Sequence, residues 1–212
     1  MAKPKSRTKA SPPPYHHGDL RRALIDTALA MLREEGAWSF TLREVARRAG
    51  VSHTAPYNHF NDKAALLAEV AGPGFQSLRE RLEGAARAPP RSGRQALIGI
   101  GGAYVRFGVE QPAHYRLMFG PDLAEKERHP NLQAAADATF AELTGALTRA
   151  QAGGEVRQGP VHEQALIAWS LVHGLTMLFI DQRLTFLGVS SAEAGRHGRG
   201  AAVTLCDGLN KR

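Results

Sequence analysis

Six side chains in the second half of the chain are of the types that carry out general acid and base catalysis. They are His114, His162, His173, Asp122, Asp137 and Glu163. An enzyme site also needs a recognisable frame around such groups, such as a nucleophile elbow, paired carboxylates, a zinc signature or a glycine-rich loop after a strand. The sequence contains none of these frames, and the glycine-rich segment around Gly99 follows no strand pattern. We therefore expect no enzymatic activity.

The sequence supports neither a metal site nor an intramolecular disulfide. His16 and His17 are adjacent, so they point in different directions, and no acidic or cysteine partner stands at ligand spacing. Cys206 is the only cysteine, which excludes an intramolecular disulfide and fits a reducing cytoplasm. We expect no metal and no other cofactor.

A different chemistry, hydrogen bonding to nucleic acid, is indicated between Thr41 and Lys63. Thr41 and Glu44 form a Thr-x-x-Glu capping box, and apolar residues then follow at helical spacing as far as Gly50. Ser52 is a good N-cap for a second short helix that ends near His59. Two short helices joined by a glycine-containing turn are typical of a helix-turn-helix, whose second helix enters the DNA major groove.

The same stretch, with the residues around it, resembles a known family. The blocks LREVA (42–46), AGVS (49–52), YNHF (57–60) and DKAALL (62–67), together with YHHGDLR (15–21), stand in the order and spacing of the TetR/AcrR family of transcriptional regulators. Several linked blocks over about fifty residues are far more specific than one motif. Beyond about Ala71 the resemblance is looser.

The resemblance implies a set of DNA-binding residues. They are Thr41, Arg43, His53, Thr54, Ala55, Tyr57, Asn58, His59 and Lys63. Asn58 suits an adenine edge, Ala55 a thymine methyl group, and Arg43 guanine or phosphate. Tyr57, His59 and Lys63 suit phosphate, where they position the protein without specifying sequence. Thr41 is expected to act both as helix cap and as phosphate donor.

The distribution of charge agrees with a polyanionic partner. The net charge is +7, and residues 1–63 contain eleven Lys and Arg against six Asp and Glu, leaving only +2 for the rest of the chain. Part of this excess lies in residues 1–14, which are basic and proline-rich and which we interpret as a disordered arm. The apolar run Ala165–Ile180 is short and contains polar residues, so no membrane span is expected.

No stretch alternates apolar and polar residues as a strand would, so the chain is predicted to be all-α, with about nine helices. We divide it into the arm (1–14), a three-helix DNA-binding domain (15–65) and an effector-binding and dimerisation domain (66–212). Trp38 and Phe40 are expected to close the core of the three-helix domain. The proline of Gly72-Pro73-Gly74 predicts a break in the helix that joins the two domains.

In the second domain, the segment WSLVHG (169–174) resembles the Trp-His-Gly motif of one TetR subgroup. Trp169 and His173 are four residues apart and share a helix face. A histidine beside a tryptophan is more often a core or interface residue than a ligand contact, so both interpretations stay open.

The family resemblance implies a homodimeric repressor that leaves its operator DNA when a small molecule binds. Apolar residues surround Val161–Ile180 on nearly all sides, which predicts that this helix and the last one pack against a second copy. We expect an apolar or aromatic effector in a pocket lined by Tyr104, Phe107, Tyr115, Met118, Phe119, Trp169 and His173.

Two alternatives compete with these expectations. The aromatic and apolar residues assigned to the pocket would serve a well-packed core equally well. The glycines between Gln95 and Glu110 indicate either close helix contacts, a weak helix or removed side-chain volume, and the last of these favours a cavity. A helical scaffold that binds only protein is the third functional class, but it would not need the segment Thr41–Lys63.

Overall fold

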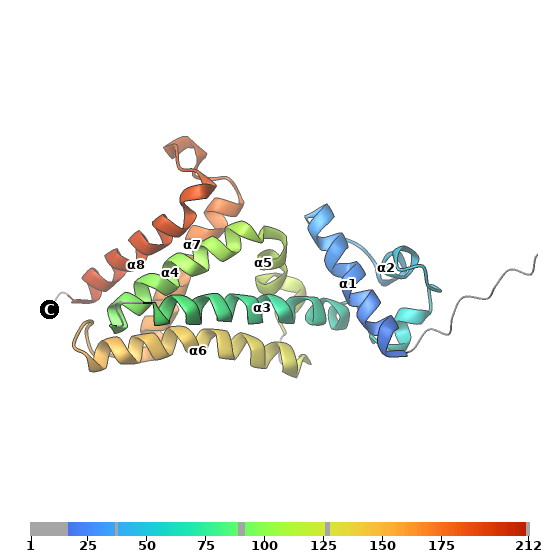
Figure 1. Ribbon diagram of the computed structural model, residues 1–212, viewed down its shortest axis with the longest axis horizontal. Helices are drawn as coiled ribbons and strands as arrows, with labels where there is room; N and C mark the ends of the chain where they lie inside the picture. Colours follow the sequence, from blue (N-terminus) through green and yellow to red (C-terminus); the bar gives the residue numbers. More distant parts are fainter. Residues whose placement is uncertain (1–16, 37, 89–91, 126–127, 211–212) are drawn as a thin grey trace, which may run out of the picture.

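The chain forms helices throughout the part that the structure, a computed structural model, describes: residues 17–36, 38–88, 92–125 and 128–210 (Figure 1). These residues contain eight α-helices and several short 3-10 helices, and none of them belongs to a strand. The predicted all-α class is confirmed. The predicted arm, residues 1–14, lies outside the described residues.

The end of the molecule with the predicted DNA-binding segment consists of α1 (His17–Glu35), α2 (Leu42–Arg48) and the start of α3 (Lys63–Arg87). Its buried core contains Leu24, Ala28, Leu32, Phe40, Val45, Phe60 and Leu66. The capping box before α2 is confirmed: the Thr41 hydroxyl accepts from the Glu44 N–H (3.2 Å), and the Glu44 carboxylate accepts from the Thr41 N–H (2.7 Å). This box sets the direction in which α2 leaves the preceding loop.

The second helix of the predicted helix-turn-helix is shorter and tighter than expected. It is a 3-10 helix, η1 (Ala55–Asn58), and not an α-helix capped by Ser52. An α-helix starting there needs a hydrogen bond from the backbone nitrogen of Pro56 to the Ser52 carbonyl, and proline has no N–H to donate. The Ser52 carbonyl instead accepts from Ala55 (3.0 Å), which closes the smaller 3-10 ring.

Helix α3 continues through the expected break. Asp62 caps it by accepting from the Ala65 N–H (2.8 Å), and the helix runs unbroken to Arg87 with Pro73 inside it. The turn before the proline has an outside partner, because the buried His114 side chain donates from Nε2 to the Val70 carbonyl (2.8 Å). Burial lowers the pKa of His114, so the ring is neutral at pH 7. The predicted break at residues 72–74 is therefore wrong.

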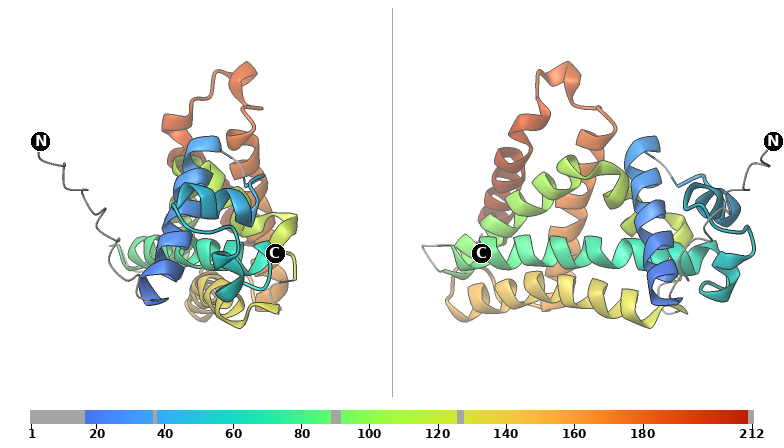
Figure 2. Two further views of the ribbon diagram at one scale, coloured as in Figure 1. Left: turned by 90° about the vertical axis from the view of Figure 1, so that its right-hand side faces the viewer. Right: turned by 45° about the vertical axis from the view of Figure 1, so that its right-hand side comes forward.

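The second half of the chain packs around α3. Figures 1 and 2 show α3 as a long central helix that runs beside α6 from the DNA-binding end to the opposite end of the molecule. Both α4 and α6 pack on α3, and α7 and α8 cover the far side of α4. The bounds are α4 (Gly93–Glu110), α5 (Pro112–Phe119), α6 (Pro130–Ala152), α7 (Val161–Ile180) and α8 (Ala194–Asn210).

The glycines of α4 allow close helix contacts, and one of them, Gly101, also lines the cavity described below. A Cβ on Gly102 would lie 2.9 Å from the Gly195 carbonyl of α8, and one on Gly198 would lie 2.4 Å from the Gly101 carbonyl. A Cβ on Gly99 would meet the Ala85 carbonyl of α3 at 2.7 Å. The volume that these glycines leave is filled by neighbouring backbone. The interpretation of these glycines as positions of close helix contact is confirmed.

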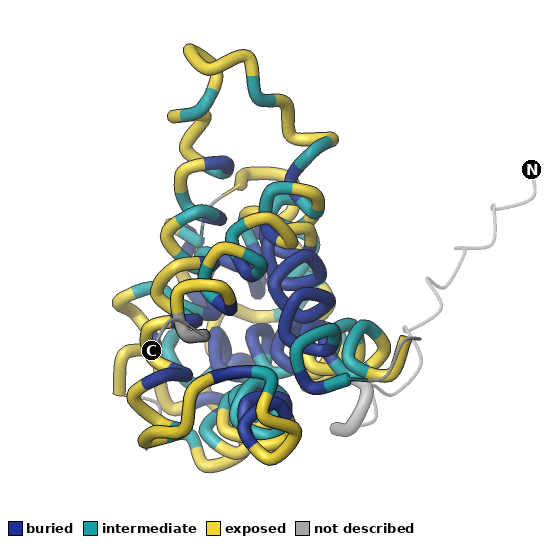
Figure 3. Tube along the Cα trace, turned by 90° about the vertical axis from the view of Figure 1, so that its left-hand side faces the viewer, coloured by how far each residue is buried: buried dark blue, intermediate teal, exposed yellow. Residues whose placement is uncertain are grey.

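Helix α7 has one buried side and one exposed apolar side. Ala165, Ala168, Val172 and Phe179 are buried, whereas Leu166, Ile167, Leu171 and Leu178 are each between 40% and 56% exposed. By length and composition this helix could also cross a membrane, although it packs on α4, α6 and α8. Figure 3 shows that the connection from α7 to α8 projects from the body with most of its residues exposed.

Candidate DNA interface and effector cavity

The predicted DNA-binding residues lie together on one end of the molecule, with different degrees of exposure. Thr41, Arg43, His53, Thr54, Tyr57 and Asn58 are exposed, and Ala55, His59 and Lys63 are partly buried. The Tyr57 side chain is 51% exposed although it lies beside the buried Pro56. A large exposed aromatic ring with a hydroxyl suits contact with a polar partner such as a phosphate backbone.

Positive charge on this end is only partly neutralised. Among the described residues, Arg43 and Arg47 on α2 have no ion-pair partner, whereas Arg48 pairs with Glu34. The exposed face of α2 therefore presents guanidinium groups to solvent. Guanidinium groups free of carboxylates are the groups that neutralise phosphates when a protein binds DNA.

Lys63 and Thr41 are held by intramolecular contacts as well. The Lys63 ammonium donates to the Trp38 carbonyl (2.5 Å) and lies 5.7 Å from the centre of the Phe40 ring. The Thr41 hydroxyl donates to the Glu44 carboxylate (2.9 Å). Both side chains thus support the loop between α1 and α2, and their predicted phosphate contacts stay predictions.

Phe40 is buried in the core, and Trp38 is partly buried and packs against that core while also reaching outside the three-helix domain. The Trp38 indole N–H donates to the Asp122 carboxylate (2.5 Å), and a Cβ on Gly120 would meet its ring at 3.1 Å. Trp38 therefore joins the DNA-binding end to the segment that follows α5. No local pattern in the sequence signals a contact across 84 residues.

A cavity of about 340 Å³ lies between α3, α4, α5, α6, α7 and α8. Its wall is mostly apolar, with contributions from Phe75, Leu78, Leu82, Leu97, Ile100, Phe140, Leu143, Leu147, Val172 and Leu205. Ligand cavities of this kind, between the helices of a bundle, typically hold drug-sized molecules. Cys206, a free and buried cysteine, also lines it.

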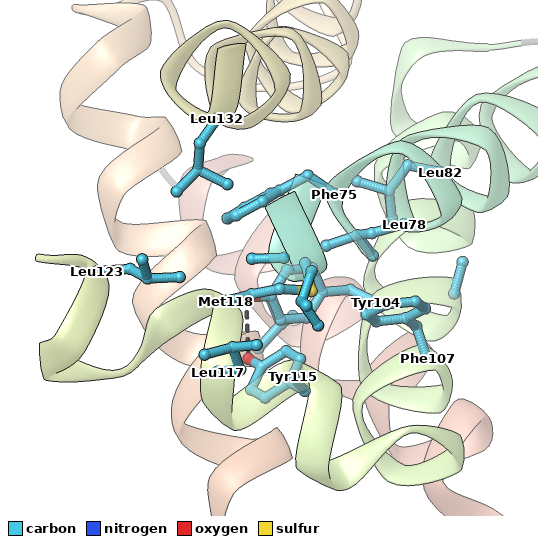
Figure 4. Close-up of a cluster of buried hydrophobic side chains, with 14 of the residues drawn as sticks. Phe75, Leu78, Leu82, Tyr104, Phe107, Tyr115, Leu117, Met118, Leu123 and Leu132 are labelled. Atoms are coloured by element: carbon cyan, nitrogen blue, oxygen red, sulfur yellow. Dashed lines mark hydrogen bonds between the residues drawn. The ribbon is translucent and has the colours of Figure 1, made fainter. Parts of the chain in front are cut away.

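Only part of the predicted effector set lines this cavity. Tyr104, Phe119 and Trp169 do. Phe107, Tyr115 and Met118 are fully buried beside it, and the partly buried His173 lies behind Tyr104 and Tyr115. Figure 4 shows the cluster of buried hydrophobic side chains in which residues of α3, α4 and α5, including Tyr115 and Met118, meet. The sequence prediction missed the walls from α3, α6 and α8, although the stripe Gln133, Asp137 and Phe140 on α6 has the helical spacing of a shared face.

The polar groups beside the cavity satisfy one another. The Tyr104 oxygen accepts from the Trp169 indole N–H (2.9 Å) and from the Tyr115 hydroxyl (2.9 Å). Nδ1 of His173 lies 2.6 Å from the Tyr115 oxygen and 3.2 Å from that of Tyr104. Burial raises the pKa of both tyrosines and lowers that of His173, so all three are neutral at pH 7. This network fixes Trp169, whose ring faces the cavity, against α4.

Two family patterns match the chain in separate regions. Residues 24–70 match the family described as "Bacterial regulatory proteins, tetR family", and residues 97–197 match "Tetracyclin repressor-like, C-terminal domain". The first region contains α2 and η1, and the second contains the helices α5 to α7 and most of α4. Resemblance to the Trp-His-Gly subgroup is not tested by these matches and stays a prediction.

Solved structures of individual proteins are also similar to this chain. A solved structure of a protein with unknown function from Rhodococcus sp. RHA1 is 32% identical, with a TM-score of 0.75, and covers 94% of this chain and 100% of its own. The TetR family transcriptional regulator PfmR from Thermus thermophilus is 19% identical, with a TM-score of 0.66 over 89% of this chain and 99% of its own, which shows a shared fold.

Among curated proteins, the uncharacterized HTH-type transcriptional regulator YobS from Bacillus subtilis is 29% identical over 98 residues, 46% of this chain and 50% of that protein. The chain spans about half the length of the first curated relatives it matches. These relatives are transcriptional regulators and not enzymes. The chain itself belongs to the TetR family of bacterial transcriptional regulators.

Proposed function

We propose that this protein is a cytoplasmic, homodimeric repressor that binds operator DNA through residues 15–65 and releases it when a small apolar or aromatic molecule enters the cavity of residues 66–212. The observation that carries this proposal is the continuity of α3. Its first residue, Lys63, is bonded to the Trp38 carbonyl, and Phe75, Leu78 and Leu82 further along the same helix line the cavity.

This continuity supplies the coupling between the two sites. A ligand that needs more room than the empty cavity must displace the wall helices, and a rigid helix transmits a displacement to its other end. The ligand shifts the population toward a spacing of the two DNA-binding ends that does not fit the operator, provided that it binds that spacing more tightly. Domains that change relative orientation in this way need no change in their own folds.

The exposed apolar side of α7 supports the homodimer. Ile167, Leu171 and Leu178 follow one another at helical spacing on the surface, and an exposed stripe of this kind is uncommon on a monomer. Contact with the same stripe of a second copy around a two-fold axis would bury it. The dimer would then hold two DNA-binding ends for two half-sites of an operator.

The first test is an unbiased selection of DNA sequences bound by the purified protein. We expect one enriched, two-fold symmetric sequence, and a gel shift on it that the variant Asn58→Ala weakens. Small molecules are then screened for release of that DNA. Failure to enrich any sequence from random and genomic pools would overturn DNA-binding function, whereas an operator complex that no ligand of any class dissociates would overturn ligand-dependent release only.

A further inference from the structure

The wall of the cavity contains one formal charge, the carboxylate of Asp137. The other lining side chains among the described residues are uncharged, and they include no lysine or arginine. Asp137 also has no ion-pair partner in the part of the chain that the structure describes. A carboxylate that is not neutralised by the protein gives this end of the cavity a negative potential.

The position of Asp137 on α6 places it at the edge of the apolar wall. Gln133, Asp137 and Phe140 are four and three residues apart, so they share one face of the helix, and all three line the cavity. The Gln133 side chain donates from Nε2 to the Asp137 carboxylate (2.6 Å), which limits the rotation of the acid. Asp137 is exposed, so the cavity is open to solvent beside it.

Aromatic rings line the same cavity. The Trp169 ring centre lies 6.1 Å from that of Phe140 and 6.0 Å from that of Phe119, and the Phe119 centre lies 5.4 Å from that of Phe75. All four rings line the cavity. Aromatic rings attract cations through their quadrupole, and groups of rings are a common way to bind ammonium groups that cannot donate hydrogen bonds.

We propose that the ligand of this cavity is an amphiphilic cation: an apolar body that fills the inner wall and a tertiary or quaternary ammonium group that lies between Asp137 and the aromatic rings. This inference rests on the proposed effector cavity and names its ligand class. An anionic ligand of the same shape would place a second negative charge beside Asp137. A neutral one would fill the apolar wall but gain nothing from the carboxylate.

The test uses three probes of matched shape. They are 4-phenylbutyltrimethylammonium, the neutral isostere in which carbon replaces the nitrogen, and 5-phenylpentanoate. Binding to the full-length protein at low salt is followed by tryptophan emission in a Trp38→Phe background, so that Trp169 alone reports, and is repeated by calorimetry. We expect the cation to bind about tenfold more tightly than the neutral probe, and the anion to bind most weakly.

The variant Asp137→Asn isolates the charge. It should weaken the cation about tenfold and leave the affinity of the neutral probe unchanged. Glu142→Gln is the matched control, because Glu142 lies further along α6, pairs with Arg79 (3.3 Å) and does not line the cavity. This control should leave the affinities of all three probes at their original values.

The possible failures can be told apart. Equal affinity for the cationic and neutral probes, or loss of cation binding in Glu142→Gln but not in Asp137→Asn, would overturn the ligand class and leave the cavity as a site for neutral molecules. Absence of binding by all three probes would overturn the cavity as a ligand site. Repressor function is judged separately, by operator binding in gel shifts without any probe.

Discussion

The indole N–H of Trp38 donates a hydrogen bond of 2.5 Å to the carboxylate of Asp122. Trp38 belongs to the loop between α1 and α2, and Asp122 belongs to the short 3-10 helix after α5. Phe119, at the end of α5, lines the cavity. This contact between the DNA-binding end and the rest of the molecule therefore involves a residue, Asp122, that is three positions along the chain from Phe119 of the cavity wall.

Replacing Asp122 by alanine should loosen this contact without unfolding either part. We expect the free energy of unfolding to fall by about 1 kcal/mol, because a hydrogen bond to a charged but exposed group is lost. In a Trp169→Phe background, Trp38 emission should shift to longer wavelength as its ring becomes more exposed. Glu125→Ala, which removes a carboxylate that pairs with Arg128, is the control. Unchanged Trp38 emission in Asp122→Ala would mean that the contact does not exist in solution.

The capping box before α2 should make stability depend on pH. A hydrogen bond from the Thr41 backbone N–H holds the pKa of the Glu44 carboxyl below its usual value of 4.5. The unfolded state then binds the proton more readily than the folded state, so the contribution of Glu44 is present above pH 4.5 and is lost as the pH falls through the lowered pKa. Denaturant unfolding of wild type and Glu44→Gln between pH 3 and 7 measures this. A stability difference that stays constant over that range would contradict it.

The cap residue itself can be tested at neutral pH. Thr41→Ala removes the side-chain oxygen that accepts from the Glu44 N–H, and such substitutions typically cost about 1 kcal/mol. Thr41→Ser keeps that oxygen and should be close to wild type. Thermal unfolding of the three proteins distinguishes the cap from any other effect of the position. Equal losses in the two variants would assign the effect to the threonine methyl group.

Asn58 and Lys63 should differ in how they affect DNA binding. Asn58→Ala is expected to cost about 1–3 kcal/mol at one operator position, because a base contact is lost, whereas Lys63→Ala should weaken all sequences alike and reduce the salt slope by about one. Because Lys63 also bonds to the Trp38 carbonyl, the melting temperature of Lys63→Ala must be measured beside its affinity. If Asn58→Ala lost the same affinity for operator and for random DNA, Asn58 would not contact a base.

Two glycine substitutions should change the free energy of unfolding in opposite directions, because only one of them introduces a clash with a neighbouring helix. Gly198→Ala places a Cβ 2.4 Å from the Gly101 carbonyl and should destabilise the fold by roughly 1–3 kcal/mol. Gly84→Ala adds a Cβ on the exposed side of α3, where nothing lies within 4 Å, and should stabilise it by about 0.5–1 kcal/mol. Chemical denaturation compares them directly. A neutral Gly198→Ala would show that the two helices can move apart without cost.

The exposed side of α7 predicts the oligomeric state. Ile167→Glu and Leu178→Glu should convert a dimer into a monomer, because each places a charge in a buried apolar contact. Thr148→Glu, on the exposed side of α6, should leave the mass unchanged. Light scattering at micromolar concentration measures all three. A monomeric wild type would contradict the dimer before any variant is made.

Several features of this protein follow from local residue patterns, and they were the ones predicted correctly. The capping box before α2, the all-α class and the helix Val161–Ile180 depend on side chains within a few residues of each other. The DNA-binding segment could be located for the same reason, because helix, turn and helix are contiguous in the chain. Linked motifs at fixed spacing then identified its family.

Where the sequence misled, the deciding partner came from elsewhere in the chain. Pro73 does not break α3: residues on both sides of it are buried in the core, and the His114 side chain donates to the Val70 carbonyl in the turn before it. Trp38 packs against the core and also bonds to Asp122, 84 positions further along the chain, which no local pattern predicts. Local propensity is worth about 1–3 kcal/mol per residue at most, and tertiary packing can outweigh it.

The local sequence thus determined which residues form helices and which segment can read DNA, since these depend on short-range hydrogen bonds and periodicity. Only the tertiary structure decided where the cavity lies. Its walls come from six helices, α3 to α8, and the space beside several glycines is taken up by the backbone of a neighbouring helix. The position of a cavity depends on how the helices pack. Asp137 could therefore be recognised as a candidate ligand contact only from the packing of α6 against α7.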